Sequence, residues 1–298
     1  MIKLVRPGVK ALKAKAVTRI GREIEQRLAD FNDEISFFLF LDHEFSRRLS
    51  DFGGAAGKLF TTDIFARNPY APMIHVKVDE LPDFIRRNRS NSFSIYLAAS
   101  YEVSSSFFDT ALEFLQVTNA GSLTLPRRMR EGPEQYYART LAASGLPGPS
   151  DDLIRTISWI RYRRNGLVHV AGTAISPFPD LARNHGVALN AFWASAKLTL
   201  DFSNAATGAL DEGQTIELLK LLRISIQKLD SHFASLIHPE GLAKAEAERL
   251  FSHQCIRMNK LVASKRSATL QRALWDGYGV RATDAELIKA VRAYGVRV

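Results

Sequence analysis

Six consecutive residues, Arg164-Asn165-Gly166-Leu167-Val168-His169, carry side chains suited to proton transfer and charge balance on a phosphodiester. A neutral imidazole takes up a proton near pH 7 and an imidazolium returns it, so His169 can act as general base and general acid. Arginine stays charged at any working pH, so Arg164 can balance the charge that develops on a pentacoordinate phosphate. Neither step requires a metal ion, and we expect no metal and no cofactor.

The helix that should position these residues is predicted to run from Ser150 to about Ala171. Ser150-Asp151-Asp152 supplies an N-cap and an acidic first turn, and Gly172 and Pro177 end the helix. Leu153, Ile157, Ile160 and Leu167 mark its buried stripe, and Arg164 lies within about 20° of Ile157. The pattern therefore predicts a core-facing arginine that needs an anion, either a phosphate or a carboxylate from Glu102, Asp109 or Glu113.

Asn165 and His169 are four residues apart and share a face that also carries Ser158 and Tyr162. In a regular helix Arg164 and His169 point about 140° apart. They can converge through the length of the arginine, through distortion near Gly166, or across two copies of the chain. We expect the last, a site completed in a homodimer.

Helical periodicity dominates the rest of the chain, and the expected fold class is all-α. Helices are predicted over 17–50 with a polar interruption at Asn32-Asp33, then 92–117, 133–143, 150–171, 187–203 and 214–237. Ile74 to Val78 alternates as in a short strand or an extended connector. The four long apolar faces at 92–117, 150–171, 187–203 and 214–237 favour a four-helix up-down bundle.

Three regions follow from this pattern: an N-terminal helical region with an irregular connector at 1–91, the bundle at 92–237, and a basic C-terminal helical appendage at 238–298. Within the appendage, Thr283-Asp284-Ala285-Glu286 has the sequence of a capping box.

Composition limits the class of protein. The 298 residues contain one cysteine, Cys255, which excludes an internal disulfide and a cysteine-rich zinc cluster. The longest apolar run, Ile35 to Leu41, is too short to cross a bilayer, and the start of the chain lacks a signal peptide's apolar stretch. We expect a cytoplasmic protein with no membrane partner.

Charge is concentrated at the two ends. The net charge is +9, and residues 1–30 and 239–298 each carry +5, which leaves the middle near neutral. Basic ends suit a polyanion such as nucleic acid, although an ordinary solvated surface explains them equally well.

Two motifs fail on inspection. Gly53-Gly54-Ala55-Ala56-Gly57-Lys58 lacks the first glycine and the final Ser/Thr of a phosphate loop. His43-Glu44 begins like a zinc-protease helix, but Arg47 stands where the second histidine is required.

The segment from Arg164 to His169 resembles the HEPN superfamily, whose hallmark is Arg, four to six residues and His, often with Asn directly after the Arg. The late position of the motif in a long helix and the earlier segment Leu97 to Glu102 are also similar to that family. The resemblance covers roughly residues 92–237. Val170-Ala171 follow the histidine where some toxin branches have a tyrosine, which weakens assignment to the branch paired with a nucleotidyltransferase antitoxin.

The resemblance implies a helical bundle that dimerises along the motif helices and cleaves RNA without a metal, as a toxin or a phage-defence or stress effector. His169 would be the acid/base, Arg164 the phosphate ligand, and Asn165 a positioning or polarising group. Glu102 would orient Arg164, and Tyr162 would support the site. RNA contacts are expected from Arg127, Arg128, Arg130, Arg161 and Arg163.

Two alternatives stay open. The chain can be a HEPN-like helical module without catalysis that binds RNA or a protein, with Arg164 as a structural partner of Glu102. It can also be an unrelated helical protein that meets the spacing by chance. An antitoxin or regulatory protein would be a further partner of the ribonuclease.

Overall fold

The computed structural model describes residues 17–50, 57–119, 121, 123–168, 177–205, 209–251 and 263–293. In these ranges the regular structure is helical, which confirms the all-α prediction, and no helix there is long and apolar enough to span a membrane. The contacts divide the chain into two compact units. The first holds residues up to Glu25, Glu113–Ser122 and the residues from Ile226 onward, and the second holds Gln26–Leu112 and Leu123–Ser225.

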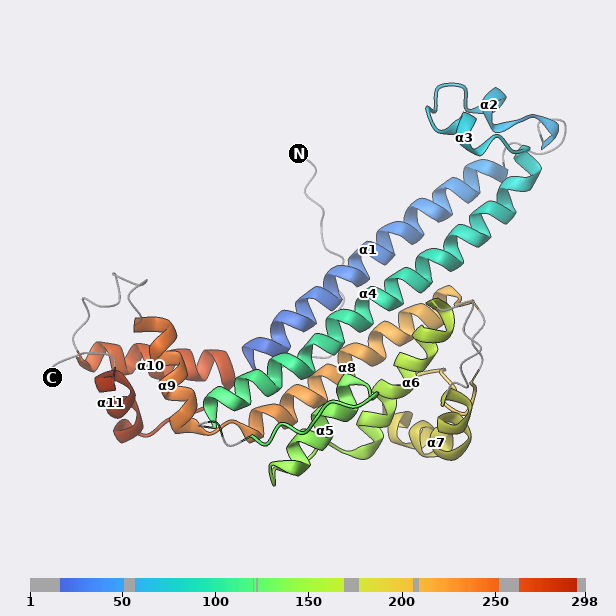
Figure 1. The fold of residues 1–298 in the computed structure, drawn as a ribbon. Helices are drawn as coiled ribbons and strands as arrows, with labels where there is room; N and C mark the ends of the chain where they lie inside the picture. Colours follow the sequence, from blue (N-terminus) through green and yellow to red (C-terminus); the bar gives the residue numbers. More distant parts are fainter. Residues whose placement is uncertain are drawn as a thin grey trace. The chain divides into compact units, whose positions relative to one another are not determined.

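The greater parts of two long helices, α1 (Arg19–Ser50) and α4 (Leu81–Thr118), lie side by side in the second unit (Figure 1). Phe38 of α1 packs edge-on against Phe93 of α4 at a centroid distance of 6.1 Å. Asp42 of α1 forms an ion pair with Arg89 of α4. The predicted interruption at Asn32-Asp33 is absent because α1 continues through it. Its inner face, which includes the buried Ile35, stays continuous across those two polar residues.

α4 begins eleven residues before the predicted start at Ser92. Its first turn contains Pro82 at the second position and the acidic Asp83, and both favour a helix N-terminus. The residues that follow are mostly polar and exposed. The periodicity of apolar residues therefore does not reveal that the helix starts at Leu81.

Short elements connect α1 to α4: α2 (Thr61–Ile64), α3 (Ala71–Ile74) and the 3₁₀ helix η2 (Val78–Glu80). The predicted strand or connector at Ile74–Val78 forms one antiparallel bridge, between Phe60 and Lys77. Only the centre of this segment is extended, because Ile74 ends α3, His75 takes a left-handed conformation (φ 36°) and Val78 begins η2.

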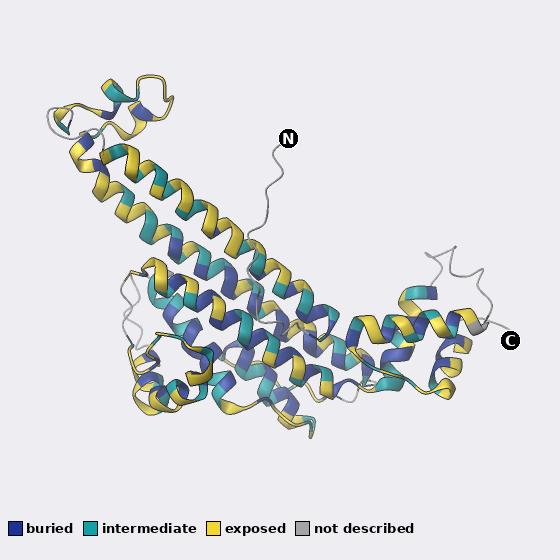
Figure 2. Cartoon of the chain, turned by 180° about the vertical axis from the view of Figure 1, so that it is seen from behind, coloured by how far each residue is buried: buried dark blue, intermediate teal, exposed yellow. Residues whose placement is uncertain are grey.

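The remaining helices of the second unit are α5 (Pro133–Ala143), α6 (Asp151–Val168), α7 (Phe178–Trp193), the 3₁₀ helix η3 (Ala194–Ala196) and the start of α8 (Glu212–Leu236). The prediction of a helix at 187–203 is wrong in its bounds. The helix starts nine residues earlier because Pro177 and Pro179 both fit a helix start. It ends at Trp193 and passes into η3, which Lys197 terminates in a left-handed conformation (φ 50°). Buried residues lie along α4, α6 and α8, and these helices contribute much of the core (Figure 2).

The first unit contains α9 (Pro239–Phe251), α10 (Ala263–Tyr278) and α11 (Asp284–Ala293), with the adjoining ends of α1, α4 and α8. The predicted capping box is confirmed. The Thr283 backbone N–H donates to Glu286 at 2.7 Å, and the Glu286 N–H donates to the Thr283 hydroxyl at 3.3 Å.

A buried carboxylate in the first unit caps the start of α1 from a distant part of the sequence. Asp230 of α8 accepts hydrogen bonds from the backbone N–H groups of Val17 (2.5 Å) and Thr18 (2.8 Å) and from the Thr18 hydroxyl. Gly21 leaves room for it, since a Cβ there would lie 2.3 Å from the carboxyl carbon. Asp230 thus holds the two residues that precede α1, and the Thr18 hydroxyl in turn caps the first turn by accepting from the Gly21 N–H at 3.1 Å.

We expect Asp230→Ala to lower the free energy of unfolding by about 2–4 kcal/mol, because several buried donors lose their acceptor at once. Ser231→Ala, at the next, exposed position of α8, should change it by less than about 0.5 kcal/mol. Chemical denaturation followed by circular dichroism measures both. Equal effects of the two substitutions would contradict this role of Asp230.

Candidate functional site

Arg164 lies near the end of α6 and is held by groups from two helices. Its Nη2 forms an ion pair with Glu102 of α4, and its Nη1 donates to Asn165 Oδ1 at 3.0 Å. The guanidinium carbon lies 5.8 Å from the centre of the Tyr101 ring, within range of a cation–π contact. The structure thus brings together three predicted site residues, Arg164, Asn165 and Glu102.

The two partners of this ion pair differ in how far their side chains are exposed. The Arg164 side chain is 20% exposed, whereas that of Glu102 is 60% exposed. An ion pair whose carboxylate stands largely in water contributes little to stability, roughly 0–1 kcal/mol. A phosphate oxygen that reaches this position can therefore replace the Glu102 carboxylate on Arg164 at small cost.

A second carboxylate, Glu134 of α5, is fully buried beneath the same helix. Its Oε1 accepts hydrogen bonds from the Ser158 hydroxyl at 2.6 Å and from Arg161 Nε at 3.0 Å. Burial lowers the pKa of Arg161, but the charge of Glu134, the nearby Tyr162 and Tyr101 and the hydrogen bond to Glu134 together outweigh it, so the pKa lies above its usual value. Sequence reasoning missed Glu134 because nothing in its local pattern distinguishes a buried carboxylate from an ordinary acidic first-turn residue.

The start of α5 is shaped around this carboxylate. Gly132 is the N-cap residue and Pro133 the first residue of the helix, which places Glu134 in the first turn. A Cβ on Gly132 would lie 2.4 Å from Glu134 Oε1 and 2.6 Å from Arg161 Nε. Only glycine therefore lets the chain pass this close to the buried ion pair.

Tyr101 lies between the two carboxylate sites. It is buried, and burial followed by the nearby charge of Glu134 raises the pKa of its hydroxyl far above the usual value. The tyrosine stays protonated at any physiological pH. Its ring serves as an uncharged surface behind the Arg164 guanidinium.

Arg163, rather than Arg164, is the most buried arginine of α6, with 6% of its surface exposed. Leu153, Ile157 and Ile160 of the predicted stripe are buried, whereas Leu167 is half-buried. A second face through Trp159 and Arg163 is buried as well. Trp159 packs there against Phe178 and Phe202. α6 is therefore covered on two sides. A single stripe of apolar residues in the sequence predicts only one of them.

The Arg163 side chain lines a cavity of about 420 Å³ with Trp159, Leu210 and Asp211. Its Nη1 is buried and finds no acceptor among the described residues. Burial lowers the pKa of the guanidinium, and the charge of Asp211 opposes that shift. Arg163 thus carries a buried charge with incomplete compensation.

The predicted RNA-contacting arginines fall into two groups. Arg127, Arg128 and Arg130 are exposed on the loop before α5, where Arg128 pairs with Asp109 and lies over the Tyr136 ring. Arg161 and Arg163 do not belong to this exposed group. Arg161 is committed to Glu134, although its guanidinium also lies 4.3 Å from the ring of Tyr162, a predicted supporting residue.

His169 lies outside the described residues, so the structure presents the arginine side of the predicted site alone. In the described ranges no group of three or more His, Cys, Asp and Glu side chains is arranged to hold a metal ion.

The two carboxylates should respond differently to removal. Glu134→Ala is expected to cost about 3–5 kcal/mol, because it leaves Arg161 charged and without its partner. Glu102→Ala should cost less than about 1 kcal/mol, since its carboxylate is mostly in solvent. Urea denaturation of both variants and wild type measures the difference. A large loss in Glu102→Ala would show that Arg164 needs this carboxylate for folding.

Arg163→Met should leave the free energy of unfolding unchanged or raise it by about 1–2 kcal/mol, because an apolar side chain of similar length removes an incompletely compensated buried charge. Thermal unfolding monitored by circular dichroism tests this. A loss of more than about 1 kcal/mol would indicate that Arg163 has a structural partner.

Comparison of the chain with protein-family models, with curated proteins and with solved structures finds no match. Any functional proposal for this site therefore depends on its own residues and their geometry.

Proposed function

We propose that this chain is a metal-independent endoribonuclease of HEPN type, with α4, α6, α7 and α8 as its four-helix bundle. The observation that supports the proposal best is the state of Arg164. Its guanidinium is ordered by Asn165 and Tyr101 but bound to a mostly exposed carboxylate. Such an arginine is positioned in advance for an anion that arrives from solvent.

The proposed reaction is a transphosphorylation within RNA. His169 takes the proton from a ribose 2′-hydroxyl, and the 2′-oxygen forms a bond to the adjacent phosphorus. Arg164 contacts the non-bridging oxygens while their charge increases, in the place that Glu102 occupies in the free protein. The bond to the 5′-oxygen breaks, and that oxygen receives a proton from an imidazolium. The products are a 2′,3′-cyclic phosphate and a 5′-hydroxyl, with no metal and no net proton consumed.

A homodimer is part of the proposal. In a regular helix Arg164 and His169 would point about 140° apart, so two copies that meet along α6 would each supply one group to a shared cleft. The exposed Arg127, Arg128 and Arg130 would guide RNA by phosphate contacts. Proteins with this activity must be restrained in their host, so we propose a toxin, phage-defence or stress effector held by an antitoxin or regulatory protein.

One observation favours a second candidate, a non-catalytic helical module that binds RNA or a protein. Both terminal nitrogens of Arg164 already have acceptors within the chain, Asn165 for Nη1 and Glu102 for Nη2. On this alternative Arg164 is structural and His169 has no role. Arg164→Ala would then unfold the protein, and His169→Ala would change nothing.

Cleavage of a 5′-labelled RNA in excess EDTA tests the proposal. We expect wild type to release fragments that end in a 2′,3′-cyclic phosphate, and His169→Ala and Arg164→Ala to cut at least about 100-fold more slowly. Arg155→Ala is the matched control, because Arg155 lies on the same helix and pairs with Asp151 and Asp152. Circular dichroism should show all variants folded. Cleavage at the wild-type rate in both His169→Ala and Arg164→Ala would rule out this mechanism.

A further inference from the structure

A cavity beside α6 places a buried positive charge and a negative charge in the same space. Its volume is about 420 Å³, within the range of small-molecule sites, and the residues that line it belong to the second unit. Arg163 of α6 and Asp211, which directly precedes α8, both line it. Arg163 Nη1 is buried and has no hydrogen-bond acceptor among the described residues. Burial lowers the pKa of this guanidinium, and the charge of Asp211 opposes that shift without cancelling it.

The second carboxylate that lines the cavity is committed to other groups. The Oδ1 atom of Asp201 accepts hydrogen bonds from Asn190 Nδ2 at 2.8 Å and from the Ser203 N–H at 2.9 Å. The segments 169–176 and 206–208, which lie outside the described residues, contain no acidic residue. A buried guanidinium is costly without an anion, so an anion that enters the cavity would complete a compensation that the chain leaves incomplete.

A hydrogen-bond acceptor in the same cavity also lacks a partner. Gln214 lies in the first turn of α8, where its backbone N–H donates to Asp211 Oδ1 at 2.7 Å. Its side-chain Oε1 is buried, and no donor reaches it from the described residues. Gln214 and Asp211 therefore form an edge of the cavity that favours a donor, and a positively charged donor most of all.

The remaining surface of the cavity is partly apolar. Trp159, Leu210 and Leu218 line it, and all three are buried. The indole Nε1 of Trp159 donates to the Phe202 carbonyl oxygen at 3.0 Å, so the hydrogen-bonding group of this ring is already satisfied. What the ring presents to the cavity is apolar, and an apolar group of a ligand can pack against it.

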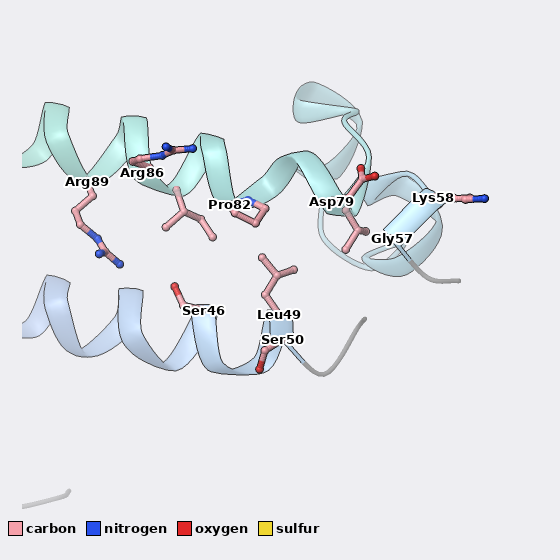
Figure 3. A pocket seen from close by; sticks show the side chains of 11 residues that line it. Ser46, Leu49, Ser50, Gly57, Lys58, Asp79, Pro82, Arg86 and Arg89 are labelled. Carbon is pink, nitrogen blue, oxygen red and sulfur yellow. The ribbon is translucent and has the colours of Figure 1, made fainter. Parts of the chain in front are cut away.

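A larger cavity of the second unit differs in its charges. It has a volume of about 650 Å³ and lies between the end of α1 and the start of α4 (Figure 3). Two arginines that line it already have carboxylate partners, Asp83 for Arg86 and Asp42 for Arg89. Lys58 is exposed and points away from the cavity (Figure 3). This larger cavity therefore gives no comparable reason to expect a charged ligand.

The charges that line the smaller cavity select the kind of molecule that fits. They are one arginine and two aspartates. A ligand with only a negative charge would meet both aspartates, and one with only a positive charge would leave Arg163 uncompensated. We propose that this cavity binds a small zwitterion with an apolar side chain, of the α-amino acid class. Its carboxylate contacts Arg163, and its ammonium group faces Gln214 and Asp211. This site does not rest on the proposed ribonuclease function.

Matched ligands test both charges of the proposed occupant. The probes are L-leucine and L-phenylalanine, with analogues that lack the ammonium group (isocaproate, hydrocinnamate) or the carboxylate (isoamylamine, phenethylamine). We expect at least one of the two amino acids to bind wild type, and both of its analogues to bind at least about tenfold more weakly. Isothermal titration calorimetry measures the dissociation constants, and saturation-transfer NMR detects the weaker complexes.

Two substitutions assign the binding to this cavity. Arg163→Met should weaken binding of the amino acid about tenfold or more, because the charged donor of its carboxylate is lost. Asp211→Asn keeps a side chain that can cap α8 but removes the charge that faces the ammonium group. It should weaken binding of the amino acid about threefold, but not that of the carboxylate analogue. Arg155→Met and Glu212→Gln are the matched controls, because neither residue lines the cavity, and both should bind as wild type does.

Circular dichroism verifies that each variant is folded. Failure of both amino acids to bind, equal binding of an amino acid and its carboxylate analogue, or unchanged affinity in a folded Arg163→Met variant would each overturn the proposal. If Arg163→Met does not fold, Asp211→Asn decides. A loss of affinity for the amino acid alone supports the site, and unchanged affinity contradicts it.

Discussion

The buried carboxylate of Glu134 is the constraint on which the arrangement of the candidate site depends. An ionised carboxyl group inside a helical core is tolerated only when hydrogen bonds and an opposite charge compensate the loss of water. Ser158 and Arg161 supply these on α6, and Gly132 supplies the space at the start of α5. These contacts fix the register of α6 against α5, and with it the direction in which each following side chain points.

Three arginines within one helical turn consequently meet three environments. Arg161 compensates a buried charge, Arg163 lines a cavity, and Arg164 remains partly exposed beside Glu102. All three have the same pKa in water and similar reach, so composition cannot distinguish their roles. What distinguishes Arg164 is that its anionic partner can leave without exposing a buried charge. An arginine that binds a ligand is expected to have a partner that an incoming anion can replace, as Glu102 can be replaced on Arg164. Glu134 cannot be replaced on Arg161 in this way, so Arg161 is part of the scaffold.

Local signals in the sequence were sufficient for much of the fold. Ser150 with two aspartates placed the start of α6. Glu102 was one of three carboxylates proposed for Arg164, and it is the one that the structure brings there. Non-local contacts explain the failures. Trp159 and Arg163 are covered by Phe178 and the chain around Phe202, which no periodicity within α6 could reveal. Glu134 finds its partners 24 and 27 residues away.

The Asp230 cap has a consequence for the order in which the protein is made. The second unit ends at Ser225, so all of its residues leave the ribosome before Asp230 does. The first unit combines Thr18 with Asp230, 212 residues later, and with helices beyond it. The residues that precede α1 must therefore wait without the Asp230 carboxylate while the second unit is synthesised. A segment synthesised before the second unit becomes ordered after it, and until then its donors and apolar side chains are available to chaperones.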